Sequence, residues 1–541
     1  MTINMALAQT DFYKTFHKDG YHPDIKKVYS NYTSRNGRLS NVSGGDSVVF
    51  VGLQYFIKDV LIDEWNNTFF NLPKEQAIHN FKRIVDNSLM IDYDMSHFEA
   101  LHDLQYLPLS IKALPEGVSV PYGVPPVTFV NTVDGFQWLS NYIETVFSTE
   151  NWPIQTSATT AKAYLKNTIA SFDRAGLDHD LIPFMVHDFS FRGCFGRHAA
   201  AMSGFGHLTS FAGTDTIPAI LFAEKYYNAN VEKELVGASV LATEHSTATS
   251  YIMAMVEDLG ITKLEAEVMY VEYLFTKAPT GILSHVSDSF DFWAFVSEGL
   301  PKLKEAIMSR EGKFVIRPDS GDIIKVLTGY TVFDKYTFDT VDDVCNHTHD
   351  YPQDTYDYEV YKLKDGSYVE IENFGVVSVE EVKGLVECLW DVFGGTLSPT
   401  GMKVLDEHIG AIYGDSVTLQ RQEEIIKRLE DKDFAALVVL GVGSYSYQYV
   451  TRDTHASAVK GTWVEKDGKG IDVCKDPATD RSKKSAKGLL RVELSGGKYV
   501  LYDQQTKEQE SQGELTTVFL DGQLTRETSL AEIRERIKSS L

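Results

Sequence analysis

The 541-residue sequence has few cysteines, few prolines and no long hydrophobic run. Its four cysteines lie far apart and form no CxxC pair, which argues against a disulfide framework and favours a reducing compartment. The longest apolar stretch, residues 435–443, has the size of a buried strand rather than a membrane span. The N-terminus lacks a basic segment followed by an apolar one, so nothing marks it for secretion. We therefore expect a cytoplasmic protein with no membrane partner.

Basic residues are also fewer than acidic ones. The chain has 51 Lys and Arg against 76 Asp and Glu, a formal net charge of −25. So acidic a surface repels phosphodiester backbones, which argues against a nucleic-acid partner. Hydrophobic residues make up 43% and charged residues 23%, which is typical of a globular protein. A site for a phosphorylated substrate would have to concentrate arginine and lysine against this overall field.

The middle of the chain alternates short apolar strands with helical stretches. The expected strands are residues 183–189, 208–211, 236–241, 281–286, 313–316, 410–413 and 436–440. Apolar residues at three- and four-residue spacing predict helices at 217–227, 264–275, 292–308 and 419–429. This alternation favours a parallel sheet, and so many units favour an irregular (β/α) barrel-like α/β domain.

The two flanks of the chain differ from this centre. Residues 36–130 and 460–541 carry strands punctuated by proline and glycine, and we expect them to form one composite β-rich domain. Residues 1–35 and 131–459 are assigned to the barrel-like domain. Within it, roughly ninety residues separate two expected strands, more than such a connection needs. The segment at about 325–405 is therefore expected to be an inserted subdomain, with a hairpin at 364–366.

Charged residues and glycines follow the expected strands. They are His187-Asp188, Asp215, Glu244-His245, Ser287-Asp288, Arg317-Pro318-Asp319 and Gly414-Asp415. In a parallel α/β barrel the chemistry sits on the loops after the strands, so these side chains are expected to share one rim.

Two glycine loops and two arginines at this rim indicate phosphate binding. Residues 414–416 and 441–444 each end a strand and open a helix, where backbone N–H groups can meet a phosphate. Arg192 and Arg317 offer guanidinium forks that suit a diphosphate. The alternatives are ordinary tight turns for the loops and salt bridges to Asp188 or Asp319 for the arginines.

His245 stands beside Glu244 at the end of an expected strand. A neighbouring carboxylate can fix the tautomer of a histidine and raise its nucleophilicity, so His245 is a candidate phosphate acceptor. A histidine taken alone is more often structural than catalytic.

One cluster of metal-binding residue types lies inside the insert: Cys345, His347, His349 and Asp350. It could serve a metal-dependent barrel hydrolase, or it could be a polar loop without metal. A non-catalytic interaction protein that uses the acidic insert is a third interpretation, but it leaves the polar rim unexplained.

Several longer motifs occur in a fixed order: TDFYK, KVYSNYTSR, HDFSFRG, FAGTDT, ASVLATEHST, SDSFD, IRPDSGD, YGDSV, VTRD and KDPATD. With them the chain resembles the nicotinamide phosphoribosyltransferase family, a group of type II phosphoribosyltransferases, over nearly its whole length. The resemblance implies synthesis of nicotinamide mononucleotide from nicotinamide and phosphoribosyl pyrophosphate in NAD biosynthesis. It also implies Mg²⁺ bound mainly through substrate phosphates, coupled ATP hydrolysis and a homodimer with shared active sites.

The resemblance also implies roles for individual residues. Phe189 would stack on the pyridine ring, Tyr13 of the partner chain would cover its other face, and Asp215 would accept a hydrogen bond from the carboxamide. Arg192 and Arg317 would hold base and diphosphate.

His245 would be phosphorylated from ATP with Glu244 beside it, and Asp288 and Asp319 would lie near the ribose and the Mg²⁺-bound diphosphate. The remaining phosphoribosyl contacts would be Gly414, Asp415, Ser416, Gly443, Ser444 and Arg452, with Arg35, Lys460 and Lys483 from the partner chain.

The nearest rival is a nicotinate phosphoribosyltransferase with the same fold and mechanism. Asp215 argues against it, because a carboxylate facing the carboxylate of nicotinate would place like charges in a poorly hydrated pocket. The chain departs from the family pattern at Ser444 and Tyr445, where the family has glycines.

Overall fold

The computed structural model describes residues 3–352, 357–414, 416–475 and 485–541. Its centre is a curled parallel sheet, a half-barrel of six strands in the order β6-β17-β16-β9-β8-β7. These are β6 (Val186–Asp188), β7 (Leu241–Ala242), β8 (Leu283–Val286), β9 (Phe314–Arg317), β16 (Ile409–Tyr413) and β17 (Val439–Val442). All five strand pairs are parallel, so every strand ends at the same edge. The predicted α/β class with a barrel-like parallel sheet is confirmed.

The strands are joined by helices, as the apolar spacing predicts. The connecting helices include α8 (Ile217–Tyr227), α9 (His245–Leu259), α10 (Lys263–Lys277) and α17 (Leu419–Asp431). The single helix expected at 292–308 is instead α11 (Phe292–Ala294), a π-helical turn η7 (Phe295–Gly299) and α12 (Leu300–Ser309). α10 begins at a capping box, in which Thr262 and Glu265 each accept the other's backbone N–H.

The strand expected at 208–211 is wrong. Leu208 is the last residue of α7 (Arg197–Leu208), and a turn follows it. Gly213 and Thr214 instead form isolated parallel bridges to Ala238 and Asp188, which continue the curl of the sheet beyond β6. A short apolar run is buried equally well as a helix end or as a strand, and apolar spacing alone does not separate the two.

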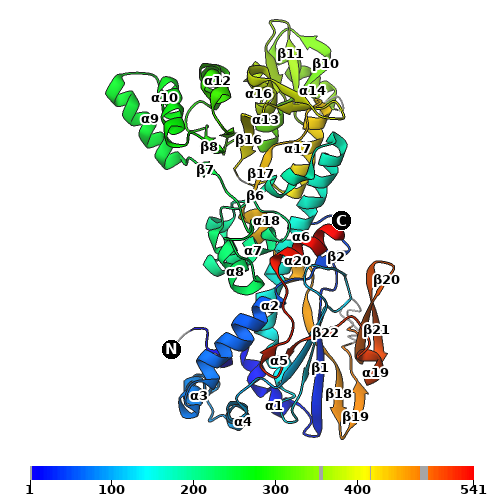
Figure 1. Ribbon diagram of the computed structural model, residues 1–541. Coiled ribbons are helices and arrows are strands. Elements are labelled where there is room, and N and C mark those ends of the chain that lie inside the picture. Colours follow the sequence, from blue (N-terminus) through cyan, green and yellow to red (C-terminus); the bar gives the residue numbers. More distant parts are fainter. Residues whose placement is uncertain (1–2, 353–356, 415, 476–484) are drawn as a thin grey trace.

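A second sheet joins the two ends of the chain. It has seven antiparallel strands in the order β19-β18-β1-β5-β3-β22-β23. They are β1 (Ile25–Thr33), β3 (Leu109–Ala113), β5 (Val127–Asn131), β18 (Ala458–Lys466), β19 (Lys469–Asp472), β22 (Thr516–Leu520) and β23 (Gln523–Leu524). Figure 1 shows this sheet below the parallel one. Residues 25–33 lie in it, although the sequence-based boundary places residues 1–35 in the barrel-like domain.

Helices connect the two bodies and cover the lower sheet. α3 (Lys74–Leu89) and α4 (Ser96–Leu104) pack their apolar faces into the same core as β3 and β5. α20 (Leu530–Ser539) brings the end of the chain back to the barrel-like half, where Leu530 and Ile533 share a core with Val442. The longest described helix, α6 (Glu144–Ala175), is continuous, and polar residues are spread along its length. In the described part of the chain, no helix combines the length and apolar character that crossing a membrane requires.

The inserted segment carries its own four-stranded sheet in the order β10-β11-β12-β13, at the top of Figure 1. Its elements are β10 (Thr331–Phe338), α14 (Val341–Asp350), β11 (Glu359–Leu363), β12 (Tyr368–Glu370), β13 (Val376–Val377), α15 (Val379–Lys383) and α16 (Leu385–Phe393). β11 and β12 are antiparallel on either side of Gly366, which has a φ of +95°, so the expected hairpin is present. α16 packs into the core beneath β9 and β16.

Candidate active site

The loops after the parallel strands enclose a cavity of about 390 Å³. It is lined by Phe189, Arg192, Gly193, Asp215, Ala242, Thr243, Glu244, Arg317, Asp319, Gly414 and Ser444. Eight of these eleven residues are candidate site residues in the sequence. The parallel order of the strands explains the gathering, because each loop starts at the same edge of the sheet.

One end of the cavity holds a hydrogen-bonded carboxylate. Nε2 of His187 lies 2.9 Å from Oδ1 of Asp215, and the Ser239 hydroxyl donates to the same oxygen at 2.6 Å. Burial would raise the pKa of Asp215, but the hydrogen bonds from His187 and Ser239 and the charge of Arg317 outweigh burial and lower the pKa. Among the described residues nothing donates to Oδ2, so an ionised carboxylate offers one oxygen to the cavity.

His187 is expected at the rim from the sequence but is given no role there, and the structure places it at this end of the site. Its ring is stacked on Phe189, with centroids 4.5 Å apart and planes 30° apart. Gly213 makes room for it, since a Cβ at that position would lie 3.0 Å from Nδ1 of His187. The available signal is the motif HDFSFRG, in which a histidine lies in a short strand two residues before Phe189. Phe189 lines the cavity and His187 does not, so the Phe189 ring, supported by the stacked His187 ring, is the aromatic wall that suits a planar ligand.

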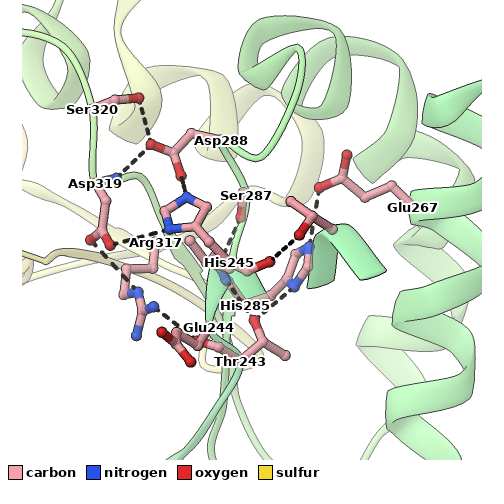
Figure 2. Close-up of polar contacts among 12 residues, drawn as sticks. Thr243, Glu244, His245, Glu267, His285, Ser287, Asp288, Arg317, Asp319 and Ser320 are labelled. Atoms are coloured by element: carbon pink, nitrogen blue, oxygen red, sulfur yellow. Dashed lines mark hydrogen bonds and ion pairs between the residues drawn. The ribbon is translucent and has the colours of Figure 1, made fainter. Parts of the chain in front are cut away.

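At the other end, His245 lies between two carboxylates. Its Nε2 is 3.0 Å from Oδ1 of Asp288, and its Nδ1 is 4.0 Å from Oδ2 of Asp319, as Figure 2 shows. His245 is the first residue of α9 and Glu244 is the residue before the helix begins. The His245 side chain is 42% exposed and adjoins the cavity behind Asp319.

The two carboxylates beside His245 differ in how they are held. Burial would raise the pKa of Asp288, but donors outweigh it and lower the pKa: the Ser320 hydroxyl at 2.5 Å, the Asp319 N–H at 2.9 Å and His245. Burial, assisted by the charge of Asp288, raises the pKa of Asp319 against the charges of Arg317, His245 and Arg192. No described residue donates a hydrogen bond to the Asp319 side chain, so both of its oxygens are available.

The two arginines stand on different elements of the rim. Arg317 ends β9, and its Nη2 donates to the Thr243 carbonyl at 2.8 Å while its Nε lies 3.8 Å from Oδ1 of Asp319. Arg192 follows β6, is exposed, and forms no ion pair with a described residue. The salt bridge considered as an alternative is present for Arg317 only as a long 3.8 Å contact with Asp319, and Arg192 forms none with a described residue.

Close packing around the loops favours glycine at two positions. A Cβ on Gly414 would lie 1.7 Å from Oδ1 of Asp319, and one on Gly193 would lie 2.0 Å from the Ser444 hydroxyl oxygen. Neither position has room for a side chain without moving a cavity-lining group. Glycine at these two positions therefore leaves the Asp319 and Ser444 side chains in place at the cavity.

Gly443 precedes α18 (Ser444–Gln448), and Ser416 has a left-handed φ of +64°. Asp415 and Lys483 lie outside the described residues. The ring of Tyr445, where the family has glycine, is stacked on Tyr449 at 4.9 Å and is 59% exposed.

His245, Asp288, Ser416 and Gly443 do not line the cavity, and neither do four further candidate residues. Tyr13, Arg35, Arg452 and Lys460 lie on or beside the lower sheet, and their charges act on one another. Burial lowers the pKa of Lys460, and Arg35, Lys475 and Arg452 act in the same direction against Glu144. Tyr13 is 67% exposed. The structure therefore divides the candidate site residues into a rim group and a second, cationic group.

The residues of CNHTHD do not form a metal site. They lie on α14, where the His347 ring packs among the rings of Phe333, Tyr336, Phe338, Tyr351 and Tyr361 with centroids 5.0–6.3 Å apart. Across residues 3–352, 357–414, 416–475 and 485–541, no three His, Cys, Asp or Glu side chains are grouped to hold a metal ion. The interpretation of the chain as a metal-dependent barrel hydrolase depended on this cluster and is therefore not supported by the described residues.

A flat aromatic wall and an ionised carboxylate at one end of the cavity suit a small polar ring, and arginines at the other end suit a phosphorylated partner. On the rim of a parallel α/β half-barrel these features define an enzyme of the phosphoribosyltransferase class. The chain belongs to the nicotinate phosphoribosyltransferase (NAPRTase) family, whose sequence model matches residues 184–523.

Relatives extend this match over the whole chain. A nicotinamide phosphoribosyltransferase from Acinetobacter baylyi is 43% identical over 98% of this chain and 96% of its own length. Another, from Xanthomonas campestris pv. campestris, is 28% identical over 98% of both chains. The crystal structure of a nicotinate-nucleotide pyrophosphorylase from Pyrococcus furiosus covers 100% of this chain and 96% of that one with a TM-score of 0.52. Its sequence identity is 14%, so this likeness concerns the fold alone.

Proposed function

We propose that this phosphoribosyltransferase acts on nicotinamide, and makes nicotinamide mononucleotide and diphosphate from nicotinamide and phosphoribosyl pyrophosphate. The single observation that carries the choice of base is Asp215, an ionised carboxylate with one available oxygen beside the aromatic wall. The names of the relatives from Acinetobacter baylyi and Xanthomonas campestris pv. campestris support the same substrate.

The rival base, nicotinate, fits this end of the cavity poorly. Its carboxylate would meet the ionised Asp215, whereas the amide N–H of nicotinamide would donate to Oδ2. His187 and Ser239 already donate to Oδ1 and hold the carboxylate in place. A site built to satisfy one polar group discriminates strongly against an analogue that lacks it, by about 10⁴ in favourable cases.

The reaction needs positioning more than covalent catalysis. The pyridine nitrogen forms a bond to C1 of the ribose while the C1–O bond to diphosphate breaks, through a centre with oxocarbenium character. Phe189 would orient the ring, and Arg192 and Arg317 would stabilise the negative charge of the departing diphosphate. The Gly193 and Gly414 loops keep side chains out of the space where the phosphoribosyl group would lie.

Mg²⁺ is the cofactor that we propose for this site. Asp288 and Asp319 are hard oxygen donors on neighbouring loops, and the two Asp319 oxygens accept no hydrogen bond from a described residue, which fits Mg²⁺. When bound, the ion would neutralise part of the diphosphate charge. Two carboxylates do not make a complete cage, so the substrate phosphates would supply the remaining ligands.

The second, cationic group is proposed to complete the site of a partner subunit. Tyr13, Arg35, Arg452 and Lys460 do not line the cavity of their own chain, and Tyr13 exposes 67% of its side chain. In a homodimer with shared sites, Tyr13 would cover the face of the pyridine ring opposite Phe189. The cationic residues would then meet the phosphoribosyl group.

ATP is proposed as a coupled co-substrate through His245. A ring nitrogen would attack the γ-phosphorus of ATP, ADP would leave, and water would later release phosphate. The two carboxylates at 3.0 and 4.0 Å fix the ring, and Arg317 and Arg192 supply nearby positive charge. A phosphohistidine here would add negative charge beside the diphosphate site and could organise its cation.

The test is a synthesis assay with purified protein, phosphoribosyl pyrophosphate and Mg²⁺, offered each base separately and with or without ATP. Mass spectrometry of the product should identify nicotinamide mononucleotide, formed faster with ATP. Synthesis of the nicotinate product alone, or of neither product, would contradict the proposal.

A further inference from the structure

Behind the cavity, three polar side chains that the proposed reaction does not use form a buried chain of contacts. Nε2 of His285 lies 3.1 Å from Oε1 of Glu267, and its Nδ1 lies 3.1 Å from the Thr243 hydroxyl oxygen. The side chains of His285 and Glu267 are 0% and 2% exposed. Figure 2 shows this relay, Glu267–His285–Thr243, running from α10 through β8 to the residue before Glu244.

The donors and acceptors of the relay fit one arrangement. The Thr243 hydroxyl oxygen accepts the Val286 N–H at 2.9 Å, which leaves its own proton to be donated to Nδ1 of His285. Nε2 of His285 then carries a proton and donates it to Glu267. Both ring nitrogens of His285, the Thr243 hydroxyl and Oε1 of Glu267 are satisfied this way, so deleting one member leaves another without this partner.

Thr243 connects the relay to the cavity. Its N–H donates to the Ser284 carbonyl at 3.0 Å, and its carbonyl accepts from Nη2 of Arg317 at 2.8 Å. That is the only hydrogen bond of the Arg317 guanidinium to the described residues, and its Nε is buried without one. The Thr243 carbonyl therefore anchors the guanidinium by a hydrogen bond, beside the longer 3.8 Å contact between its Nε and Oδ1 of Asp319.

A Glu–His–Thr chain also has the order of a nucleophilic triad, but the surroundings argue against that role. The Thr243 side chain is 7% exposed, and its hydroxyl oxygen is occupied by the Val286 N–H. A nucleophile needs a free oxygen that faces the substrate. The contacts suit positioning instead.

We propose that Glu267, His285 and Thr243 are positioning residues that fix Arg317 and thereby set how tightly the site binds the diphosphate group of its substrate. This inference rests on the proposed function to the extent that Arg317 meets a diphosphate. Of its three members only Thr243 lines the cavity; Glu267 and His285 do not.

The probe is inorganic pyrophosphate with Mg²⁺, whose Kd is measured by titration calorimetry. Thr243→Val keeps the shape of the side chain and removes the hydroxyl, and it should weaken binding about tenfold. Thr243→Ser restores the hydroxyl and should recover most of the loss. Thr168→Val is the matched control: Thr168 is 4% exposed, donates to Tyr164 and accepts from Gln422, far from the rim. It should leave the Kd unchanged even if it lowers the Tm.

A double-mutant cycle separates positioning from general damage. In an Arg317→Ala background, Thr243→Val should change the Kd by less than about twofold, because the group that it positions is gone. An equal loss in both backgrounds, or a wild-type Kd in Thr243→Val, would overturn the inference. If Thr243→Val does not fold, Glu267→Leu and Glu267→Gln replace it. Leucine should weaken binding and glutamine, which keeps an acceptor for His285, should not.

The outcome for the relay is distinct from the outcome for the proposed function. Wild-type protein that binds pyrophosphate but makes no mononucleotide would refute the function and leave the cycle interpretable. Wild-type protein that makes mononucleotide while the cycle is additive would refute the relay alone.

Discussion

Asp215 and Asp319 line the same cavity, yet their surroundings shift their pKa values in opposite directions. Asp215 accepts hydrogen bonds from His187 and Ser239, which favour the ionised form. Asp319 stands beside Asp288 and accepts no hydrogen bond from a described side chain, so burial dominates. At the first end, protein donors hold Asp215 in its ionised form before any ligand arrives and leave one oxygen for the ligand. At the second end, the positive charge around Asp319 does not offset its burial. We connect the first with selection of a neutral amide and the second with a cation-bound diphosphate.

The largest effect is expected when Asp215, at the first end of the cavity, is replaced. Asp215→Ala should lower kcat/KM for nicotinamide about a thousandfold, because the amide loses its acceptor, while the KM for phosphoribosyl pyrophosphate stays within a few-fold. Ser239→Ala is the matched control, since it removes one donor to Asp215 but keeps the carboxylate. It should have a much smaller effect. Steady-state kinetics with each substrate varied in turn measure both, and wild-type nicotinamide kinetics in Asp215→Ala would refute the assignment.

His245 tests the second end. His245→Ala should abolish acid-labile labelling of the protein by γ-labelled ATP and remove the stimulation by ATP. Basal synthesis should fall by about 10- to 100-fold, as the imidazole lies beside the diphosphate end. His179→Ala provides a control, because His179 also contacts a carboxylate but is remote from the cavity. Labelling that persists in His245→Ala would place the phosphoryl group elsewhere.

Mixing two inactive variants tests whether a partner chain completes the active site. Mixing inactive Tyr13→Ala with inactive Asp215→Ala should restore about a quarter of wild-type activity, because half of the random dimers are hybrids with one intact site. Subunit exchange is confirmed first with differently tagged chains. Confirmed hybrids without any recovered activity would argue against a shared site.

The smallest expected effects are changes in the free energy of unfolding when Asp319 or Asp215 is replaced by asparagine. The raised pKa of Asp319 means that stability falls as pH rises between the unfolded and folded pKa values, so a deficit is present at neutral pH. Asp319→Asn should remove it and raise the free energy of unfolding by up to about 1 kcal/mol. The lowered pKa of Asp215 contributes stability above its unfolded pKa, lost as pH falls through the folded one, so Asp215→Asn should destabilise at neutral pH. Urea unfolding at pH 7 measures both, and equal signs would contradict the comparison.

Much of the rim could be predicted because parallel strands place their following loops at one edge. This rule brings Phe189, Asp215, Glu244, Arg317 and Asp319 into one cavity although they are far apart in sequence. The strand expected at 208–211 failed for a local reason, since a short apolar run is also the buried end of α7. Strand topology and apolar spacing do not predict which side chains form hydrogen bonds with one another.

Three features are visible only in the structure. They are the contact between His187 and Asp215, the relay behind Thr243 and the aromatic surroundings of His347. Each depends on which rotamers face one another across elements distant in sequence. The CNHTHD cluster left metal binding open as an alternative in the sequence, and the helix decides against it, because its side chains have different neighbours there.

The central claim is that Asp215 selects the amide over the carboxylate. The most direct measurement offers nicotinamide and nicotinate together, at equal concentration, with limiting phosphoribosyl pyrophosphate and Mg²⁺, and quantifies both mononucleotides by mass spectrometry. The account predicts a product ratio above about 10³ in favour of nicotinamide mononucleotide, and a ratio that falls sharply in Asp215→Asn. A wild-type ratio near one, or one that favours nicotinate mononucleotide, would contradict it.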